Sequence, residues 1–329
     1  MAAGRADISG ISGMLEMLPP FAMRVAATLR LSDHIGSQGR TLGELALATG
    51  TNADALARLL RYLCTLGLYR EPAADRFELA PAGRLLSQRQ TGSLREWLDL
   101  ESAGGKMDLA LGGLLHSVRT GEPGYAEVFG KPFWEDMGSS PSFDALMTGK
   151  STRIAPEIAA LDFSGVACVA DVGGGVGLTL SEILRAHPGL SGVLIEREDT
   201  VAQACAAIAE AGLKDRCTVV GADIQHGVPA GADAYLLFDI LHNWDDETAE
   251  TILRNCAKAA GRGGRILIVE DLPQGDRNGY AMDLKMLVLF GGRQRTVGEF
   301  TDLAAKAGLG VHAVHELPSG FGVVEARAA

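Results

Sequence analysis

The stretch "VADVGGGVGLTLSEIL", residues 169–184, decides the fold class. It begins with the end of an apolar run, which is followed by four glycines and then by a segment long enough to form a helix. Gly173, Gly175 and Gly177 form a G-x-G-x-G pattern, which allows a tight turn and lets a ligand approach bare backbone at a helix N-terminus. A dinucleotide fingerprint would have its last glycine at position 178, where this chain has Leu178. The pattern predicts a ligand site after the first strand of an α/β unit and disfavours pyrophosphate.

Short apolar runs alternate with helix-length segments after residue 165. The runs are "ACVAD" (167–171), "GVLIE" (192–196), "CTVVG" (217–221), "AYLLF" (234–238) and "RILIVE" (265–270). They do not alternate apolar and polar residues, so we expect strands that are buried on both faces. This order predicts an α/β fold with a doubly wound, Rossmann-like, mostly parallel sheet.

The first 90 residues show helical patterning with short loops. Thr41 and Glu44 form a capping box, and Gly50 supplies a stop signal for that helix. The segment "DALARLLRYLCTLGLY" (54–69) has its leucines at the spacing of an amphipathic helix. Two short extended pieces follow around a Pro/Asp turn in "LYREPAADRFELAPAGRLL" (68–86), as in a β-wing. The order predicts a winged-helix domain over residues 1–95 that is all-helical apart from the wing.

Winged-helix units bind DNA in some proteins and mediate dimerisation in others. Residues 1–90 carry 10 Lys and Arg against 8 Asp and Glu, whereas the remainder carries 20 against 33. The candidate recognition helix offers only Arg58 and Arg61, so we expect no nucleic-acid partner. The segment "ISGMLEMLPPFAMRVAATL" (11–29) has more apolar surface than a unit of this size can bury by itself. This favours a homodimer, in which a second copy would cover that surface.

Composition narrows the remaining classes. The five cysteines form no C-x-x-C pair, so neither a disulfide framework nor a zinc site is indicated. No stretch reaches the roughly 18 uninterrupted apolar residues of a membrane span, and the N-terminus lacks a secretory pattern. We expect a soluble, cytoplasmic protein with no membrane partner and no metal.

Polar residues stand where the predicted strands end, which is where open parallel sheets bind ligands. Glu196 closes the second strand and is spaced to accept hydrogen bonds from ribose hydroxyls. Asp223 and Ile224 follow the third strand and suit an adenine, although Asp223 could equally be a solvated strand-end acid. His242 follows the fourth strand, on the side of the glycine loop; a lone histidine is more often structural, but this placement favours a functional role.

The segment "GYAEVFGKPFWEDMGSSPSFDALMTGKS" (124–151) concentrates aromatic and methionine side chains in a chain that is only 5% aromatic. Its large apolar residues could be ordinary core. They could also form the wall of a pocket for a flat apolar substrate. The sequence leaves both interpretations open.

Taken together, these motifs resemble a known family. "DVGGGVG" (171–177), "LLFDILHNWDDE" (236–247), "GGRILIVEDLP" (263–273) and "MDLKMLVLFGGRQRTVGEFTDLAAKAGL" (282–309) follow the winged-helix start and the "FWEDM…PSFDALM" segment. In this order they are similar to the S-adenosylmethionine-dependent O-methyltransferases of the caffeate and small-molecule natural-product type. The resemblance spans nearly the whole chain.

The resemblance implies roles for individual residues. It implies that His242 is a general base oriented by Glu270. The implied contacts to S-adenosylmethionine are Gly173, Gly174, Gly175, Glu196, Arg197, Asp223, Ile224, Phe238 and Trp244. The expected substrate-binding residues are Trp134, Met137, Phe143, Met147, Asn243, Met282, Met286 and Phe290. It also implies an intertwined homodimer whose N-terminal domain contributes to the partner's substrate pocket.

Three positions depart from the family pattern. Phe238 stands where members often carry Lys or Arg, and Asn243 replaces an aspartate that commonly follows the base. Gln294 replaces a glutamate that in many members is a second carboxylate near the histidine. Some relatives keep the cofactor and perform hydroxylation, decarboxylation or pericyclic chemistry, so that outcome is the alternative to methyl transfer.

The sequence therefore predicts an O-methyltransferase of natural-product or antibiotic biosynthesis. We expect it to act on a phenolic hydroxyl of an aromatic or polyketide-like metabolite. Its domains are predicted as a dimerisation domain over 1–95, linking helices that form part of the substrate pocket over 96–160, and a catalytic domain that binds S-adenosylmethionine over 161–329.

Overall fold

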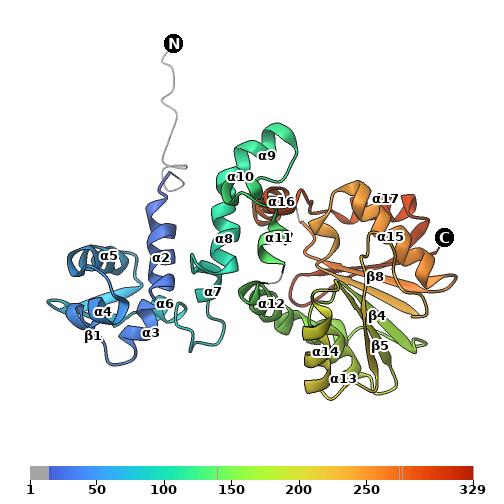
Figure 1. Cartoon of the computed structure of the whole chain (residues 1–329), viewed down its shortest axis with the longest axis horizontal. Helices are drawn as coiled ribbons and strands as arrows, with labels where there is room; N and C mark the ends of the chain where they lie inside the picture. The colour runs from blue at the N-terminus through green and yellow to red at the C-terminus, as the bar shows by residue number, and fades with distance from the viewer. Residues whose placement is uncertain (1–14, 139, 274, 276, 329) are drawn as a thin grey trace, which may run out of the picture. The chain divides into compact units, whose positions relative to one another are not determined.

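The computed structural model describes residues 15–138, 140–273, 275 and 277–328, in two compact units that divide after Asp108 (Figure 1). The family-type boundaries predicted at residues 95 and 160 stay predictions. No helix in these described ranges is long and apolar enough to cross a membrane.

The first unit is a small helical domain with a three-stranded sheet. Its elements are α2 (Leu18–Thr28), α3 (Leu31–Ile35), β1 (Arg40–Thr41), α4 (Leu42–Thr49), α5 (Ala53–Thr65), β2 (Tyr69–Ala73), β3 (Arg76–Leu79), α6 (Pro81–Arg84) and α7 (Arg95–Leu98). Thr41 and Glu44 form the predicted capping box on α4, which ends at Gly50 with φ 65°. Strands β2 and β3 are the predicted wing, and β1 pairs with β3. Leu60, Leu63 and Phe77 are fully buried and hold the helices against the wing.

Helices link this unit to the sheet of the second. They are α8 (Ala103–Leu109), η1 (Ala110–Gly113), α9 (Leu114–Thr120), α10 (Tyr125–Phe129), α11 (Phe133–Met137) and α12 (Pro141–Ala159). The last of these, α12, packs along α13 (Leu178–Ala186) beside the sheet. Residues of α12, which are distant from the glycine loop in sequence, thereby lie next to the helix that follows this loop.

The second unit contains a seven-stranded sheet in the order β6-β5-β4-β7-β8-β10-β9. Its strands are β4 (Cys168–Val172), β5 (Ser191–Glu196), β6 (Cys217–Gly221), β7 (Ala234–Phe238), β8 (Arg265–Glu270), β9 (Leu309–Glu316) and β10 (Gly322–Ala328). The first five are parallel and coincide with the five predicted runs, while β10 is antiparallel to both β8 and β9. The predicted doubly wound, mostly parallel fold is confirmed.

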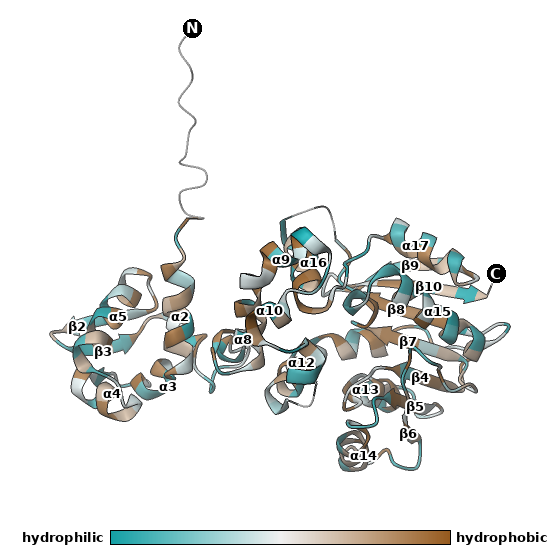
Figure 2. Cartoon of the chain, turned by 45° about the horizontal axis from the view of Figure 1, so that its top comes forward, coloured by the Kyte–Doolittle hydropathy of each residue, from teal (hydrophilic) through white to brown (hydrophobic). Residues whose placement is uncertain are grey.

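Helices cover both faces of this sheet. Alternate strand residues face opposite layers: Val169 and Leu236 pack with α12, α13 and α14 (Val201–Glu210), whereas Ala170 and Tyr235 pack with α15 (Asp246–Ala260) and α17 (Val297–Lys306). Figure 2 shows the hydrophobic colouring along these strands between the two helical layers. Burial on both faces explains why the strand sequences do not alternate.

The chain reverses its direction of winding at β4. Strand β5 lies on one side of β4 and β7 on the other, which is the kind of position at which open α/β sheets bind ligands beyond the carboxyl ends of their strands. The glycine loop, Glu196 and the turn that carries His242 all follow these strand ends.

Candidate active site

The glycine loop connects β4 to α13. Gly173, Gly175 and Gly177 all have positive φ, 74°, 60° and 82°, a conformation that favours glycine. A Cβ at position 174 would lie 2.3 Å from a carboxylate oxygen of Asp171, so this part of the loop is packed onto the strand. A Cβ at position 175 would meet nothing within 4 Å, so Gly175 borders open space.

Asp171 lies beneath this loop and was not among the predicted site residues. It is 1% exposed, and neither carboxylate oxygen has a hydrogen-bond partner of ordinary geometry among the described residues. Burial, and then the charge of Glu196, raise its pKa to about 7. The loop therefore rests on a carboxyl group that gains or loses a proton near neutral pH.

Glu196 at the end of β5 faces the glycine loop. Its Oε2 accepts a hydrogen bond from the Gly175 N–H at 3.0 Å, and its Oε1 accepts one from the Arg197 N–H at 3.0 Å. Each carboxylate oxygen has two acceptor sites, so both can still accept a hydroxyl. The arrangement suits a diol such as that of a ribose.

Asp223 and Ile224 follow β6. The Asp223 carboxylate accepts from the Gln225 N–H and contacts Nδ1 of His226 at 2.8 Å. Ile224 is partly buried against the core, and its carbonyl accepts from Asn255. Their placement at the third parallel strand end is as predicted, and their contact with an adenine stays a prediction.

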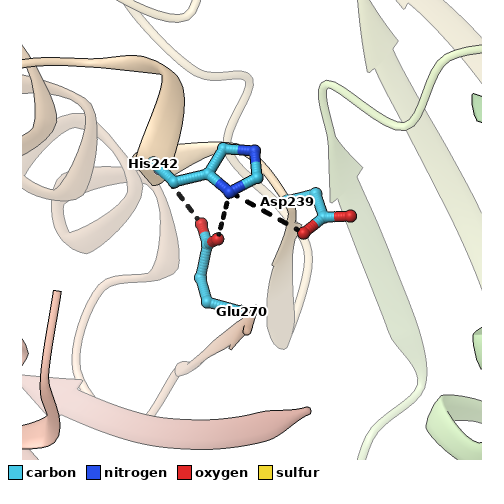
Figure 3. Close-up of side chains that lie close together, drawn as sticks. All are labelled: Asp239, His242 and Glu270. Carbon is cyan, nitrogen blue, oxygen red and sulfur yellow. Dashed lines mark hydrogen bonds and ion pairs between the residues drawn. The ribbon is translucent and has the colours of Figure 1, made fainter. Parts of the chain in front are cut away.

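The turn after β7 places His242 directly above the end of β8. Glu270, the last residue of β8, is 1% exposed, and its Oε1 accepts the N–H groups of Leu241 at 2.9 Å and His242 at 3.2 Å. Its Oε2 lies 3.0 Å from His242 Nδ1, close enough for a hydrogen bond although the pair is not aligned as one. The other ring nitrogen of His242 points away from the carboxylates (Figure 3).

A second carboxylate lies on the same side of the imidazole. Oδ1 of Asp239 is 3.9 Å from His242 Nδ1, and Oδ2 of Asp239 is 2.6 Å from Nζ of Lys150 on α12. Burial alone would lower the pKa of His242, but the charges of Glu270 and Asp239 outweigh it and raise the pKa above its ordinary value. The imidazole therefore holds a proton more readily than a histidine in water.

The ligand atoms of Asp239, His242 and Glu270 lie within 4.8 Å of one another, which is close enough to surround a metal ion. The cation in contact with this group in the structure is the Lys150 ammonium. The expectation that no metal takes part stays a prediction.

A buried arginine supports the turn. Arg295 is 1% exposed and donates to the carbonyls of Leu241 and Trp244 at 2.8 Å each, while it pairs with Asp246 at 2.9 Å. Two aspartates after Trp244 begin the next helix: Asp245 caps α15 by accepting from the Thr248 N–H, and Asp246 is its first residue. These contacts hold the histidine backbone at the strand end.

The departures from the family pattern occupy different surroundings. Phe238 packs edge-on against Phe321 at 5.9 Å, so an apolar contact stands where members often have a cation. Asn243 donates from Nδ2 to the Asp239 carbonyl and braces the turn. Gln294 is 5% exposed, and its side-chain oxygen has no hydrogen-bond partner among the described residues. Trp244 is partly buried against the core below α15.

Part of the predicted pocket wall is brought together as an aromatic cluster. Trp134 and Phe290 stack at 5.2 Å, and Trp134 and Phe143 meet edge-on at 6.0 Å. Phe133, from the same aromatic-rich segment, contacts all three of these rings. The Arg197 guanidinium lies 6.0 Å from the Trp134 ring, so the cluster adjoins the residue that follows Glu196.

The predicted methionines are not shown to join this cluster. Met137 and Met286 are 5% and 6% exposed on α11 and α16 (Arg277–Phe290), and Met147 and Met282 are partly buried on α12 and α16. Their contact with a substrate stays a prediction.

Two protein-family models match this chain. Residues 112–310 match the model of the O-methyltransferase domain, and residues 13–89 match that of the O-methyltransferase dimerisation domain. The chain belongs to the S-adenosylmethionine-dependent O-methyltransferases. The family resemblance expected from the sequence is thus confirmed.

Relatives of this O-methyltransferase cover almost its entire length. A 2,7-dihydroxy-5-methyl-1-naphthoate 7-O-methyltransferase of Streptomyces carzinostaticus is 42% identical, over 95% of this chain and 96% of the relative. The aclacinomycin 10-hydroxylase RdmB of Streptomyces purpurascens is 40% identical, over 94% of this chain and 87% of the relative. The crystal structure of NcsB1, an O-methyltransferase from neocarzinostatin biosynthesis in complex with S-adenosylmethionine and 2-hydroxy-5-methyl naphthoic acid, is 41% identical with a TM-score of 0.92, and covers 99% of this chain and all of that one.

The residues of this methyltransferase fit its cofactor. Gly175 faces open space beside the Glu196 carboxylate, which provides a bare backbone surface next to hydroxyl acceptors. The Glu196 carboxylate beside the loop also suits the positive charge of S-adenosylmethionine.

Sequence reasoning missed three residues of this methyltransferase site. Asp239 precedes His242 by three residues, and Asp171 is an acid inside an apolar run, so both left a signal in the sequence. Phe133 lies in the aromatic-rich segment 124–151 that the sequence already singled out. Lys150 left no signal, because only the packing of α12 beside the sheet brings it there.

Proposed function

We propose that this O-methyltransferase methylates a phenolic hydroxyl of an aromatic or polyketide-like metabolite, with His242 as its general base. The observation that supports this role most is the asymmetry of the imidazole. Nδ1 faces Glu270 at 3.0 Å, and the other ring nitrogen points away from both carboxylates and is free to accept a proton (Figure 3).

The chemistry requires such a base. A phenol has a pKa near 10 and is mostly protonated at neutral pH. S-adenosylmethionine, when bound, would supply a sulfonium methyl group that passes to the phenol oxygen as the S–CH3 bond breaks, with S-adenosylhomocysteine as the leaving group. His242 would take the hydroxyl proton as the new C–O bond forms, and Glu270 would stabilise the resulting imidazolium.

The aromatic cluster is the proposed surface for the acceptor. Trp134, Phe143 and Phe290 provide a flat apolar area, which favours a ring-containing substrate. The naphthoate methyltransferase of Streptomyces carzinostaticus acts on a substrate of this kind by its name. A bicyclic phenol is therefore the first substrate to test.

We also propose that the protein forms a homodimer through residues 1–90. Those residues include the match to the dimerisation domain. In the described part of this unit, apolar side chains near the start of α2 are exposed, with Leu15 at 71%, Met17 at 67% and Leu18 at 62%. A second copy of the chain would remove them from water.

The proposal is tested by incubating the enzyme with methyl-labelled S-adenosylmethionine and a panel of mono- and bicyclic phenols. We expect transfer of the label and a mass gain that corresponds to replacement of one hydrogen by a methyl group. The His242→Ala variant serves as the control for the base.

One relative supports a second candidate reaction. RdmB, at 40% identity, is a hydroxylase, so the same panel should also be examined for products that gain oxygen without the label. Oxygenated, unlabelled products would replace the methyl-transfer proposal with hydroxylation.

A further inference from the structure

The active site contains a charged pair that the proposed reaction does not use. Lys150, in the middle of α12, places its Nζ 2.6 Å from Oδ2 of Asp239, and the two side chains are only 23% and 15% exposed. Ion pairs this far removed from water are less screened than surface pairs. The helix and the turn after β7 therefore meet through a charge contact beside His242.

The backbone conformation of Asp239 directs its carboxylate toward Lys150 and His242. Its φ is 56°, in the left-handed region that few residues other than Gly, Asn and Asp adopt readily. Its N–H donates to the Val269 carbonyl at 3.0 Å and extends the sheet by one residue. The carboxylate thus lies between Lys150 on Oδ2 and His242 on Oδ1, at 2.6 Å and 3.9 Å.

We propose that Lys150 and Asp239 are positioning residues that together set how readily His242 holds a proton. The inference rests on the proposed role of His242 as base. Asp239 adds a second negative charge beside the imidazole, and Lys150 partly cancels it. Without Lys150 the protonated imidazole would be stabilised by two carboxylates, and it would release its proton less readily.

Other charged groups near the turn have partners of their own. Those on segments packed against it are Asp283, Arg293 and Arg295. Asp283 accepts from the Gln294 N–H, Arg293 pairs with Asp246 and Glu299, and Arg295 pairs with Asp246. Apart from burial, which lowers the pKa of His242, Glu270 and Asp239 raise this pKa and Lys150 lowers it. Glu270 favours the charged imidazole in every variant below, so the comparisons isolate the other two.

The decisive experiment follows the titration of the His242 imidazole by NMR in the enzyme without substrate. The chain has seven histidines, and the His242 signal is the one absent from the spectrum of His242→Ala. Asp239→Asn should move the titration to lower pH, because one negative charge is removed. Lys150→Met should move it to higher pH, because Asp239 is no longer compensated. Lys150→Arg should leave it in place.

Kinetics supply the second measurement. The midpoint on the acid side of the kcat/KM profile reports the pKa of the base in the free enzyme. This midpoint should therefore fall in Asp239→Asn and rise in Lys150→Met. The double variant Lys150→Met with Asp239→Asn should lie between the single variants. Asn tolerates a positive φ, so Asp239→Asn is the least disruptive neutral replacement.

Shifts of the His242 titration in opposite directions in Asp239→Asn and Lys150→Met support the proposal. Shifts in the same direction, or no shift in folded single variants, would overturn it. Circular dichroism establishes folding, and if Asp239→Asn does not fold, the comparison of Lys150→Met with Lys150→Arg decides. A fully active His242→Ala would refute the base role alone, because the NMR titration does not depend on turnover.

Discussion

The two ring nitrogens of His242 have different surroundings, and this difference determines what mutation should do. Nδ1 faces two carboxylates and the other nitrogen faces away from them. We expect His242→Ala to lower kcat by about 10²-fold or more, the usual contribution of a general base. Cofactor affinity, measured by calorimetry with S-adenosylhomocysteine, should change little. The loss should be smaller for phenols that are already ionised, and full activity of the variant would exclude this base.

Glu270→Gln should reduce kcat less than His242→Ala. An amide oxygen can still accept the N–H groups of Leu241 and His242, so the turn keeps its support while the charge is lost. Asp239 keeps one negative charge beside the imidazole in this variant. A loss as large as that of His242→Ala would mean that Glu270 also holds the turn through its charge.

The pH dependence follows from the direction of the histidine shift. The base acts as the neutral imidazole, and its pKa is raised above the ordinary value of 6.5. Activity should therefore fall below a midpoint that lies above pH 6.5 in kcat/KM profiles. The same shift contributes stability that is present below pH 6.5 and is lost as the pH rises through the folded pKa.

Asp171→Asn should stabilise the cofactor-free protein at alkaline pH. The folded carboxyl has a pKa of about 7 and the unfolded one 3.8, so the folded state holds a proton that the unfolded state lacks between these values. Unfolding free energy of the parent then falls across this window, by roughly 1.4 kcal/mol per pH unit at most. The advantage of the variant in urea melts should be clear at pH 8 and small at pH 4, and an equal difference at both would contradict it.

Chelator treatment tests whether Asp239, His242 and Glu270 hold an ion. Lys150 already contacts Asp239, so we expect methyl transfer to continue after dialysis against EDTA, measured with the labelled cofactor. Loss of activity that is restored by one divalent cation would show a metal requirement.

At the scale of elements, α16 links the aromatic cluster to the histidine turn. It ends at Phe290 in the cluster, and the Met286 carbonyl accepts the Gly292 N–H of the segment that lies against the turn. A Cβ at Gly292 would lie 2.2 Å from the His242 carbonyl oxygen, so this approach requires glycine. Substitutions in α16 should therefore change the binding of the acceptor more than the binding of the cofactor.

Met286→Ala should change the preference among phenols more than it changes cofactor affinity. Removal of the thioether enlarges the space on the proposed acceptor side, and flexible methionines commonly line adaptable sites. The measurement is kcat/KM over the substrate panel. Val288→Ala on the same helix is the matched control, because Val288 is fully buried and outside the predicted pocket. Equal effects of both variants, confined to stability, would place Met286 in the core.

At the scale of the whole molecule, the exposed apolar start of α2 predicts an obligate dimer. Light scattering should report about 69 kDa, twice the 34.5 kDa of one chain. Leu18→Glu should shift the mass toward one chain, because Leu18 is 62% exposed and a charge there opposes burial. The exposed Leu47→Glu, on α4, is a control for a charge placed elsewhere on this unit. A stable and active monomer of the parent would refute the dimer.

Local sequence determined the order of elements in this protein. The strand runs, the capping box at Thr41 and the glycine loop all appear where their residues predict them. These features depend on neighbours within a few residues and on burial of an element's own faces, which sequence periodicity records. The strand-end positions of Glu196 and His242 followed from the same patterns.

Only the tertiary structure decided the charge around the base. Lys150 is separated from Asp239 by 89 positions, and their contact exists because α12 packs beside the sheet. The approach of Phe133 to Phe290 depends on the same packing. Electrostatic effects depend on distance and burial rather than on spacing along the chain, so the sequence by itself could place His242 at a strand end but could not show which charges surround it.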